Sequence, residues 1–428
     1  MRFLIRITPV LLAGVFLSFF LDVNLLLVSS LLLCWLIYML GKPPVLAEFR
    51  PDIKLLFTVT VLATLGSKIL VFLKDIYITH GTLTDSMNRS IILYKICSLS
   101  VSYQSFGFIK RGLLPTIVNW MSPVYTFQIY AVQLIGFAVF IAGLLRINKK
   151  TEFAIAPKKI FIAVLLLSPI GIYSYFNFNL GFYDMVIVGL LFFSIAAGNR
   201  PASLVPDILG LLVHEAYIFI RLPFLIFSLC SLVKNKKPYT FVLVSIFINL
   251  AVLLLIVKSP RPGVEELKAN YFLHYPSLKS VTQPGDMEAF TPLCREGTLS
   301  ADLKEVQATY NGPRARSLYI PLLVSFCMIV LPGYFTSTLT GRRRTLDLTA
   351  SGSAFLFPLI LCLVGGDFGR WLGFSWVVWA IYYLLFRPNL FPESQPSFKY
   401  LYWAMLTALL FSPFGINYSP LFLTWMGH

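Results

Sequence analysis

The sequence predicts an all-α, polytopic integral membrane protein, and three observations support this prediction. First, 57% of the 428 residues are hydrophobic and only 13% are charged, with a mean hydropathy of +0.77. That is more apolar surface than a soluble domain can bury. Second, apolar runs long enough to cross about 30 Å of hydrocarbon recur from end to end, which indicates about 11–13 transmembrane helices. Third, basic residues gather in short segments between these runs, as expected of cytoplasmic loops.

The apolar runs are expected to form one transmembrane domain over residues 1–428. The first run lacks a small-residue cleavage site and a second run follows at once, so we expect a retained first helix rather than a signal peptide. A cytoplasmic N-terminus places the basic loops that follow the second and fourth runs in the cytoplasm. The candidate spans are 3–20, 23–41, 55–73, 124–145, 159–176, 183–198, 203–233, 239–257, 317–340, 349–365, 371–386 and 400–416.

The formal net charge of +16 is explained by this topology and does not indicate a nucleic-acid partner. Much of the positive charge lies in short loops, such as "KNKK" at 234–237 and "RRR" at 342–344. The six cysteines form no metal-spaced pair, and the four histidines are not paired at ligand spacing. The sequence therefore predicts no metal and no cofactor.

The span 203–233 does not fit a single crossing. One crossing would place either Arg200 or the lysines of 234–237 on the wrong side of the membrane. We expect this span to dip toward the outer face, to break between His214 and Pro223, and to return as a helical hairpin. Broken helices are tolerated where they line a watery cavity. The alternative is one long tilted helix whose charges are buried against its neighbours.

The same span contains "HEAYIFIR", which places three costly polar groups inside an apolar run. We expect apolar neighbours to raise the pKa of Glu215 toward that of a general base. His214 is an alternative base, and Arg221 is a candidate to bind a phosphate. The competing interpretation is a buried structural ion pair.

With the hairpin in place, five polar elements share the outer side. One of them, residues 74–112, is expected to form an interfacial helix over Ser90 to Val101. It then carries Lys110 and Arg111 between the glycines of "GFIKRG". Adjacent cations of these two types suit a diphosphate, because Arg offers a fork of donors and Lys a point charge. The alternative is that both side chains extend to lipid headgroups.

Two further outer elements carry residues suited to sugars. "NFNLGFYD" contains Asn179, Tyr183 and Asp184, whose amide, phenol and carboxylate groups match sugar hydroxyls. The same residues are also typical of a turn with a helix cap.

"GGDFGRW" places Asp367 and Arg370 on one helical face, with Trp371 beside them. Asp367 is a second candidate base, Arg370 a phosphate ligand and Trp371 a ring for sugar stacking. A capping ion pair and an interfacial anchor are the alternatives.

The last outer element, residues 258–316, is the only sizeable segment outside the spans. It mixes short helical patterns with proline turns and is too small for an independent domain. We expect a lid over the outer cavity. Arg261, Lys268 and His274 are among its residues that can reach an anionic carrier lipid.

In its size, its dozen spans and its outer loops with "GFIKRG", "HE" and "DFGRW", the chain resembles bacterial O-antigen and capsular polysaccharide polymerases. More broadly, it resembles the C-type integral-membrane glycosyltransferases. It departs from them in lacking a paired arginine-to-glycine loop motif and in its short first outer loop, "LDVN".

The resemblance implies a bacterial inner-membrane enzyme that moves a glycan from undecaprenyl diphosphate to a lipid-linked sugar acceptor on the periplasmic face. It also implies membrane lipids and a chain-length regulator protein as partners. The alternative function is a transporter or flippase of lipid-linked oligosaccharide, which predicts repeat symmetry and charges on both faces.

Overall fold

A computed structural model describes residues 96–150, 183–279, 294, 352–363, 371, 373–375, 377–379 and 381–382. These residues are largely helical and contain no strand, which confirms the all-α class for this part of the chain. Within it, the helical stretches Phe127–Ile147, Tyr217–Lys234 and Thr240–Val257 are long and apolar enough to cross a membrane. The first and third of these stretches match the spans predicted at 124–145 and 239–257.

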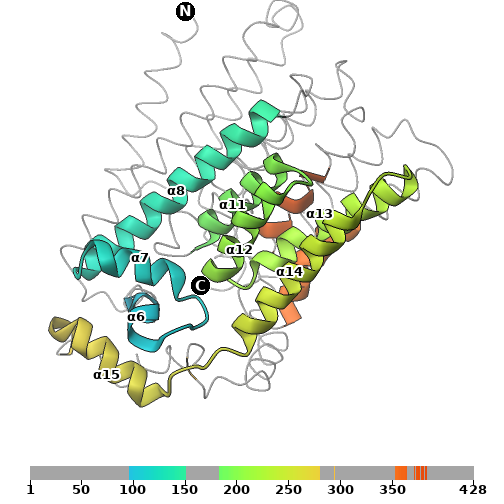
Figure 1. The fold of residues 1–428 in the computed structure, drawn as a ribbon. Helices are drawn as coiled ribbons and strands as arrows, with labels where there is room; N and C mark the ends of the chain where they lie inside the picture. The colour runs from blue at the N-terminus through green and yellow to red at the C-terminus, as the bar shows by residue number, and fades with distance from the viewer. Residues whose placement is uncertain are drawn as a thin grey trace, which may run out of the picture.

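The helices follow one another along the chain in the order shown in Figure 1. They are α6 (Tyr103–Phe106), α7 (Leu113–Met121), α8 (Tyr125–Lys150), α11 (Asp184–Ala197), η1 (Pro201–Ser203), α12 (Leu204–Val213), α13 (Tyr217–Lys234), α14 (Thr240–Val257), α15 (Val264–His274), η2 (Pro276–Leu278) and η4 (Phe357–Leu363).

Helices α8 and α11 pack in parallel, with backbones in close approach. Gly136 of α8 faces Met185, and Gly143 faces Gly189 further along α11. A Cβ atom added to Gly189 would lie 2.6 Å from the backbone of Val139. Small residues allow apolar helices to approach this closely, and the contact is characteristic of helix packing in membranes.

The predicted break in the span 203–233 is present. Helix α12 ends at Val213, His214 is extended with φ −161° and ψ 129°, and α13 begins at Tyr217. Asp207 of α12 bonds to both Tyr217 and Arg221 of α13. Because Asp207 lies seven residues before His214 and Arg221 seven residues after it, the two helices fold back on each other as a hairpin.

The helix directions define two ends of the bundle. Helix α8 runs from the lower end of Figure 1, beside α7, to the upper end. The parallel helix α11 rises with it, so α12 descends, the break lies toward the lower end, and α13 rises again. Helix α14 then returns to the lower end, where α15 lies (Figure 1). The lysines of 234–237 are thus at the upper end, and the break and α15 are at the lower end.

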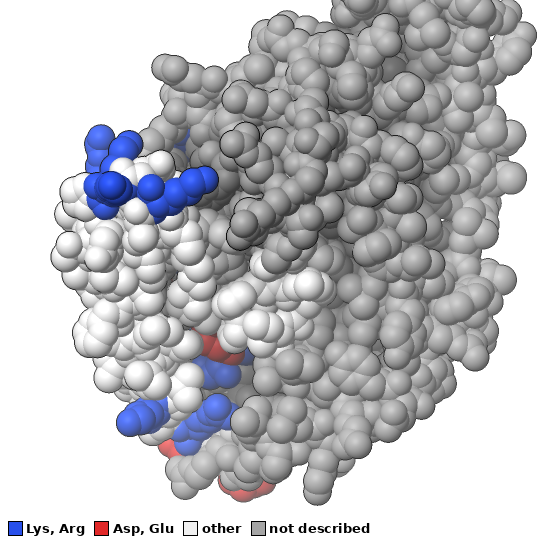
Figure 2. All heavy atoms as spheres, turned by 90° about the vertical axis from the view of Figure 1, so that its right-hand side faces the viewer, with Lys and Arg blue, Asp and Glu red and all other residues white. Residues whose placement is uncertain are grey.

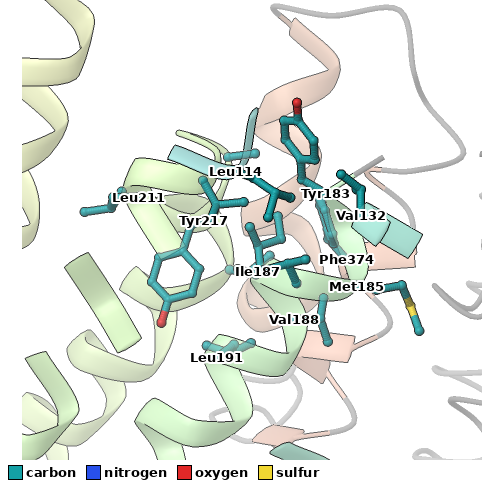
Figure 3. Packing of buried hydrophobic residues seen from close by; sticks show 14 of the residues in the cluster. Leu114, Val132, Tyr183, Met185, Ile187, Val188, Leu191, Leu211, Tyr217 and Phe374 are labelled. Carbon is teal, nitrogen blue, oxygen red and sulfur yellow. The ribbon is translucent and has the colours of Figure 1, made fainter. Parts of the chain in front are cut away.

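A shared core holds these helices together. Figure 3 shows Leu114 of α7, Val132 of α8, Ile187 of α11 and Tyr217 of α13 in one buried cluster, which also contains Phe374. Phe374 and Tyr217 are fully buried, so the segment near 374 belongs to the same core.

Helix α15, which opens the predicted lid, packs on the lower end. Leu267 and Tyr271 are fully buried. The Asn270 amide donates to the Ser100 carbonyl at 2.9 Å, and the Tyr275 hydroxyl donates to Gln128 Oε1 at 2.6 Å. Of residues 280–316, the structure describes only Cys294, which is buried.

The predicted interfacial helix over Ser90 to Val101 differs from the structure where that segment is described. Residues 96–100 are helical and almost wholly buried, because α15 and α7 cover them. The amphipathic helix at this end is α7 instead, which buries Leu114 and Val118 and exposes Ile117 and Trp120. The predicted spans 3–20, 23–41, 55–73, 159–176, 317–340 and 400–416 lie outside the described residues.

Candidate functional site

The lower end of the bundle holds a cluster of two cations around one carboxylate. Arg111 binds Glu215 with two hydrogen bonds, from Nε to Oε2 at 3.1 Å and from a terminal nitrogen to Oε1 at 2.6 Å. The Lys110 ammonium lies 2.8 Å from the same Oε1. The side chain of Glu215 is 18% exposed and those of both cations are 24% exposed. The structure thus joins residues that lie 104 positions apart.

The "GFIKRG" segment holds its cations on a constrained backbone. Arg111 has a left-handed conformation with φ 61°, which is unfavourable for a residue with a Cβ atom. Gly112 is packed against the ring of Tyr103, and the Thr116 hydroxyl donates to the Gly112 carbonyl at 2.6 Å. The surrounding contacts therefore fix the turn that directs Arg111 toward Glu215.

The break in the hairpin supplies the carboxylate. His214 is buried, and its Nδ1 accepts a hydrogen bond from the Ala216 N–H at 3.0 Å. This bond satisfies one of the backbone donors that are unpaired at the start of α13. The same Nδ1 also lies 3.4 Å from Glu215 Oε2. His214 therefore acts here as a cap that presents Glu215.

The pKa of Glu215 is lowered in this cluster, whereas a raised pKa was expected for a general base. Burial raises the pKa of Glu215, but the charges of Arg111 and Lys110 outweigh it and hold the pKa well below its ordinary range. Burial lowers the pKa of Lys110, Glu215 opposes this effect, and Arg111 adds to it. The expectation that apolar neighbours would leave Glu215 with a raised pKa is wrong, because two cations face the carboxylate.

A third cation stands near the cluster. Arg261, in the linker between α14 and α15, is close enough for its charge to lower the pKa of Lys110 further. Figure 2 shows basic side chains at both ends of a surface that has no charged side chains, and at the lower end basic and acidic atoms lie side by side in a hollow. Helix α14 exposes a set of large apolar side chains: Leu243, Val244, Phe247, Leu250, Leu254 and Leu255.

Arg221 has a different partner from the one its sequence position suggested. Its Nε donates to Asp207 Oδ1 at 2.9 Å and to Oδ2 at 3.1 Å, and the Tyr217 hydroxyl donates to Oδ1 at 2.7 Å. All three side chains are buried. This arrangement matches the structural ion pair that was the alternative interpretation of Arg221, and it joins the two arms of the hairpin.

The predicted sugar ligands that are described lie in the core. Tyr183 and Asp184 open α11, and each is 5% exposed. Asp184 sits in the first helical turn, where its negative charge is favourable. Trp371 is 7% exposed, and its ring lies 5.7 Å from that of Phe374. The predicted site residues Asn179, Asp367 and Arg370 lie outside the described residues.

Two residues of importance were missed or given little weight by the sequence analysis. Asp207 lies in an apolar run, and a carboxylate there signals a buried partner. Pairing it with Arg221 across the predicted hairpin would have found the ion pair. Arg261 was one of several cations in the predicted lid, and nothing in the sequence distinguished it from the others.

In the part of the chain that the structure describes, no group of three His, Cys, Asp or Glu side chains is placed to hold a metal ion. The comparisons with protein-family models, with curated proteins and with solved structures found no match to this chain. Its function is therefore argued from the site itself.

Proposed function

We propose that this protein is a membrane glycosyltransferase that moves a glycan from a polyprenyl diphosphate to a lipid-linked sugar acceptor. The observation that carries the proposal is the pairing of Lys110 and Arg111 with one carboxylate, with Arg261 near Lys110, at one end of membrane-length helices. A cluster with excess positive charge suits an anionic group. Its position at the end of the helices suits a ligand whose lipid tail stays in the bilayer.

The apolar band between the two charged ends supports a membrane setting. Helix α14 has 18 residues and is about 27 Å long, close to the thickness of the hydrocarbon core. After Thr240 its exposed side chains are all apolar, while Lys236 and Lys258 lie near its two ends. We infer that the membrane is a bacterial inner membrane and that the lysine-rich turn 234–237 lies on its cytoplasmic side. The cluster then lies on the outer face.

The proposed reaction needs a leaving group and a base. An acceptor hydroxyl oxygen forms a bond to the anomeric carbon, the bond from that carbon to the diphosphate oxygen breaks, and its electron pair leaves with the diphosphate. Lys110 and Arg111 stabilise the charge that develops on the diphosphate. The hydroxyl proton passes to a carboxylate, either Glu215 or Asp367.

Transfer is tested with the full chain purified into lipid nanodiscs. A synthetic repeat unit linked to polyprenyl diphosphate is added without nucleotide or metal, and the products are separated by size. We expect a ladder of longer glycans, and we expect K110A/R111A to reduce its formation by at least about 100-fold. The matched control is E265Q, at an exposed carboxylate on α15, which is expected to retain the ladder.

A different result would overturn the proposal. If the wild-type protein forms no ladder but carries the lipid-linked unit across the membrane of a sealed vesicle, the function is that of a flippase. If K110A/R111A forms the ladder at the wild-type rate, the cluster is not the diphosphate site.

A further inference from the structure

The carboxylate of Glu215 makes the same contacts that a phosphate group would make with this cluster. A guanidinium binds carboxylate and phosphate alike through two parallel donors, and an ammonium binds either as a point charge. The two hydrogen bonds from Arg111 and the contact from Lys110 are of this kind. A phosphate that approached these cations would therefore meet Glu215 already in its position.

We propose that Glu215 competes with the phosphate of a ligand for Lys110 and Arg111 and that the phosphate displaces it. This inference rests on the proposed function, since it takes a diphosphate as the ligand. It adds that the pairing of Glu215 with the two cations opposes binding instead of assisting it.

The charges favour the exchange. Among the described residues, Lys110 and Arg111 share the single negative charge of Glu215, and Arg261 adds positive charge nearby. A diphosphate brings at least two negative charges and more acceptor oxygens, so it matches the cations better than one carboxylate does. Glu215 lies in the turn between α12 and α13, directly after the extended His214, so it belongs to neither helix.

Displacement changes the chemistry of Glu215. Among the residues that the structure describes, Lys110, Arg111 and His214 are the charged or titratable groups that face Glu215, and the charge of Arg261 acts on Lys110. Once the cations hold a phosphate, burial remains as the main influence, and burial raises the pKa of a carboxyl group. The freed carboxylate becomes a better proton acceptor when a ligand is present, so binding prepares the base.

The test is titration calorimetry of the full chain in nanodiscs, with inorganic pyrophosphate as the probe. We expect E215Q, which keeps the side-chain shape and removes its charge, to bind pyrophosphate on the order of tenfold more tightly than wild type. E265Q, at a carboxylate on α15 that already pairs with Lys268, is expected to bind as wild type does. Equal or weaker binding by a folded E215Q would overturn the proposal.

A second measurement uses the wild-type protein and does not depend on how the variant folds. Titrations at about pH 6 in two buffers of different ionisation enthalpy give the number of protons taken up on binding. Wild type is expected to take up more protons than E215Q, because only wild type has a carboxylate to protonate. Subtracting the proton uptake of E215Q from that of wild type removes the protons gained or lost by pyrophosphate itself. Equal uptake by the two proteins would contradict displacement.

The source of the phosphate is tested with farnesyl diphosphate. We expect it to compete with pyrophosphate and to bind more tightly, because its isoprenoid chain reaches the apolar surface. If it does not compete, the site takes a free anion and not a lipid-linked one. These titrations need no glycan transfer, so displacement can hold where the ladder assay fails, and the ladder can form where displacement fails.

Discussion

Glu215 accepts both hydrogen bonds of the Arg111 fork, although the two residues come from separate turns and Arg111 has a strained backbone to reach it. A strained residue persists only where its surroundings over-determine its conformation. The contacts of Gly112 with Tyr103 and Thr116 supply that constraint. The strain and the ion pair can be separated by mutation.

We expect R111G to be more stable than R111A by about 1 kcal/mol, because glycine adopts a positive φ without the cost of a Cβ atom. Both variants lose the guanidinium, so their difference reports the backbone alone. Thermal unfolding in nanodiscs measures it. Lys236, in the α13–α14 turn, also has a positive φ, of 53°. We therefore expect K236G to be more stable than K236A by a similar amount, which gives a matched pair. Equal stability of R111G and R111A would show that the turn is unstrained.

The cluster also predicts a dependence of stability on pH. The pKa of Glu215 is depressed in the folded protein, so its contribution is present above the ordinary value of about 4.3 and is lost as pH falls through the lower folded value. Wild type should therefore lose thermal stability in acid more steeply than E215Q. Unfolding curves collected from neutral to acid pH measure this, and parallel curves for the two proteins would contradict the ion pair.

Much of this end of the molecule could be predicted from the sequence. Charges inside an apolar run are costly, so the "HEAYIFIR" segment required a break or a partner, and the structure has both. The pairing of Glu215 with Lys110 and Arg111 could not be predicted, because it depends on how loops 104 residues apart meet. For the same reason the predicted rise in the pKa of Glu215 was wrong in direction.

We expect the stability of the α12–α13 hairpin to depend on Asp207. Changing it to Ala leaves the Arg221 charge buried without its carboxylate, which costs about 3–5 kcal/mol. The double variant D207L/R221M replaces the pair with apolar groups and should recover most of that loss. Y217F removes one hydrogen bond and should cost about 1 kcal/mol. Thermal unfolding of the four proteins checks this order, and a stable D207A would show that the pair does not hold the hairpin.

The close approach of α8 and α11 makes a separate prediction about glycine. A methyl group at Gly189 meets the backbone of Val139, which cannot move aside as a side chain can, so G189A should separate the helices and lower the unfolding temperature. The matched control is Gly352, where an added Cβ atom meets nothing within 4 Å. G352A should be neutral or slightly stabilising. Equal unfolding temperatures for G189A and G352A would mean that the contact at Gly189 is not tight.

The placement of the two charged ends on opposite sides of a membrane is tested by labelling single cysteines. The native cysteines are first replaced, since Cys230 is exposed among the described residues. Lys237→Cys, at the upper end, and Glu265→Cys, at the lower end, are then treated in sealed vesicles with a reagent that does not cross the bilayer. Because α14 connects these ends and is long enough to cross, we expect each position to react from a different side. Reaction of both from one side would place α14 along the membrane surface, and the cluster would then have no outer face to occupy.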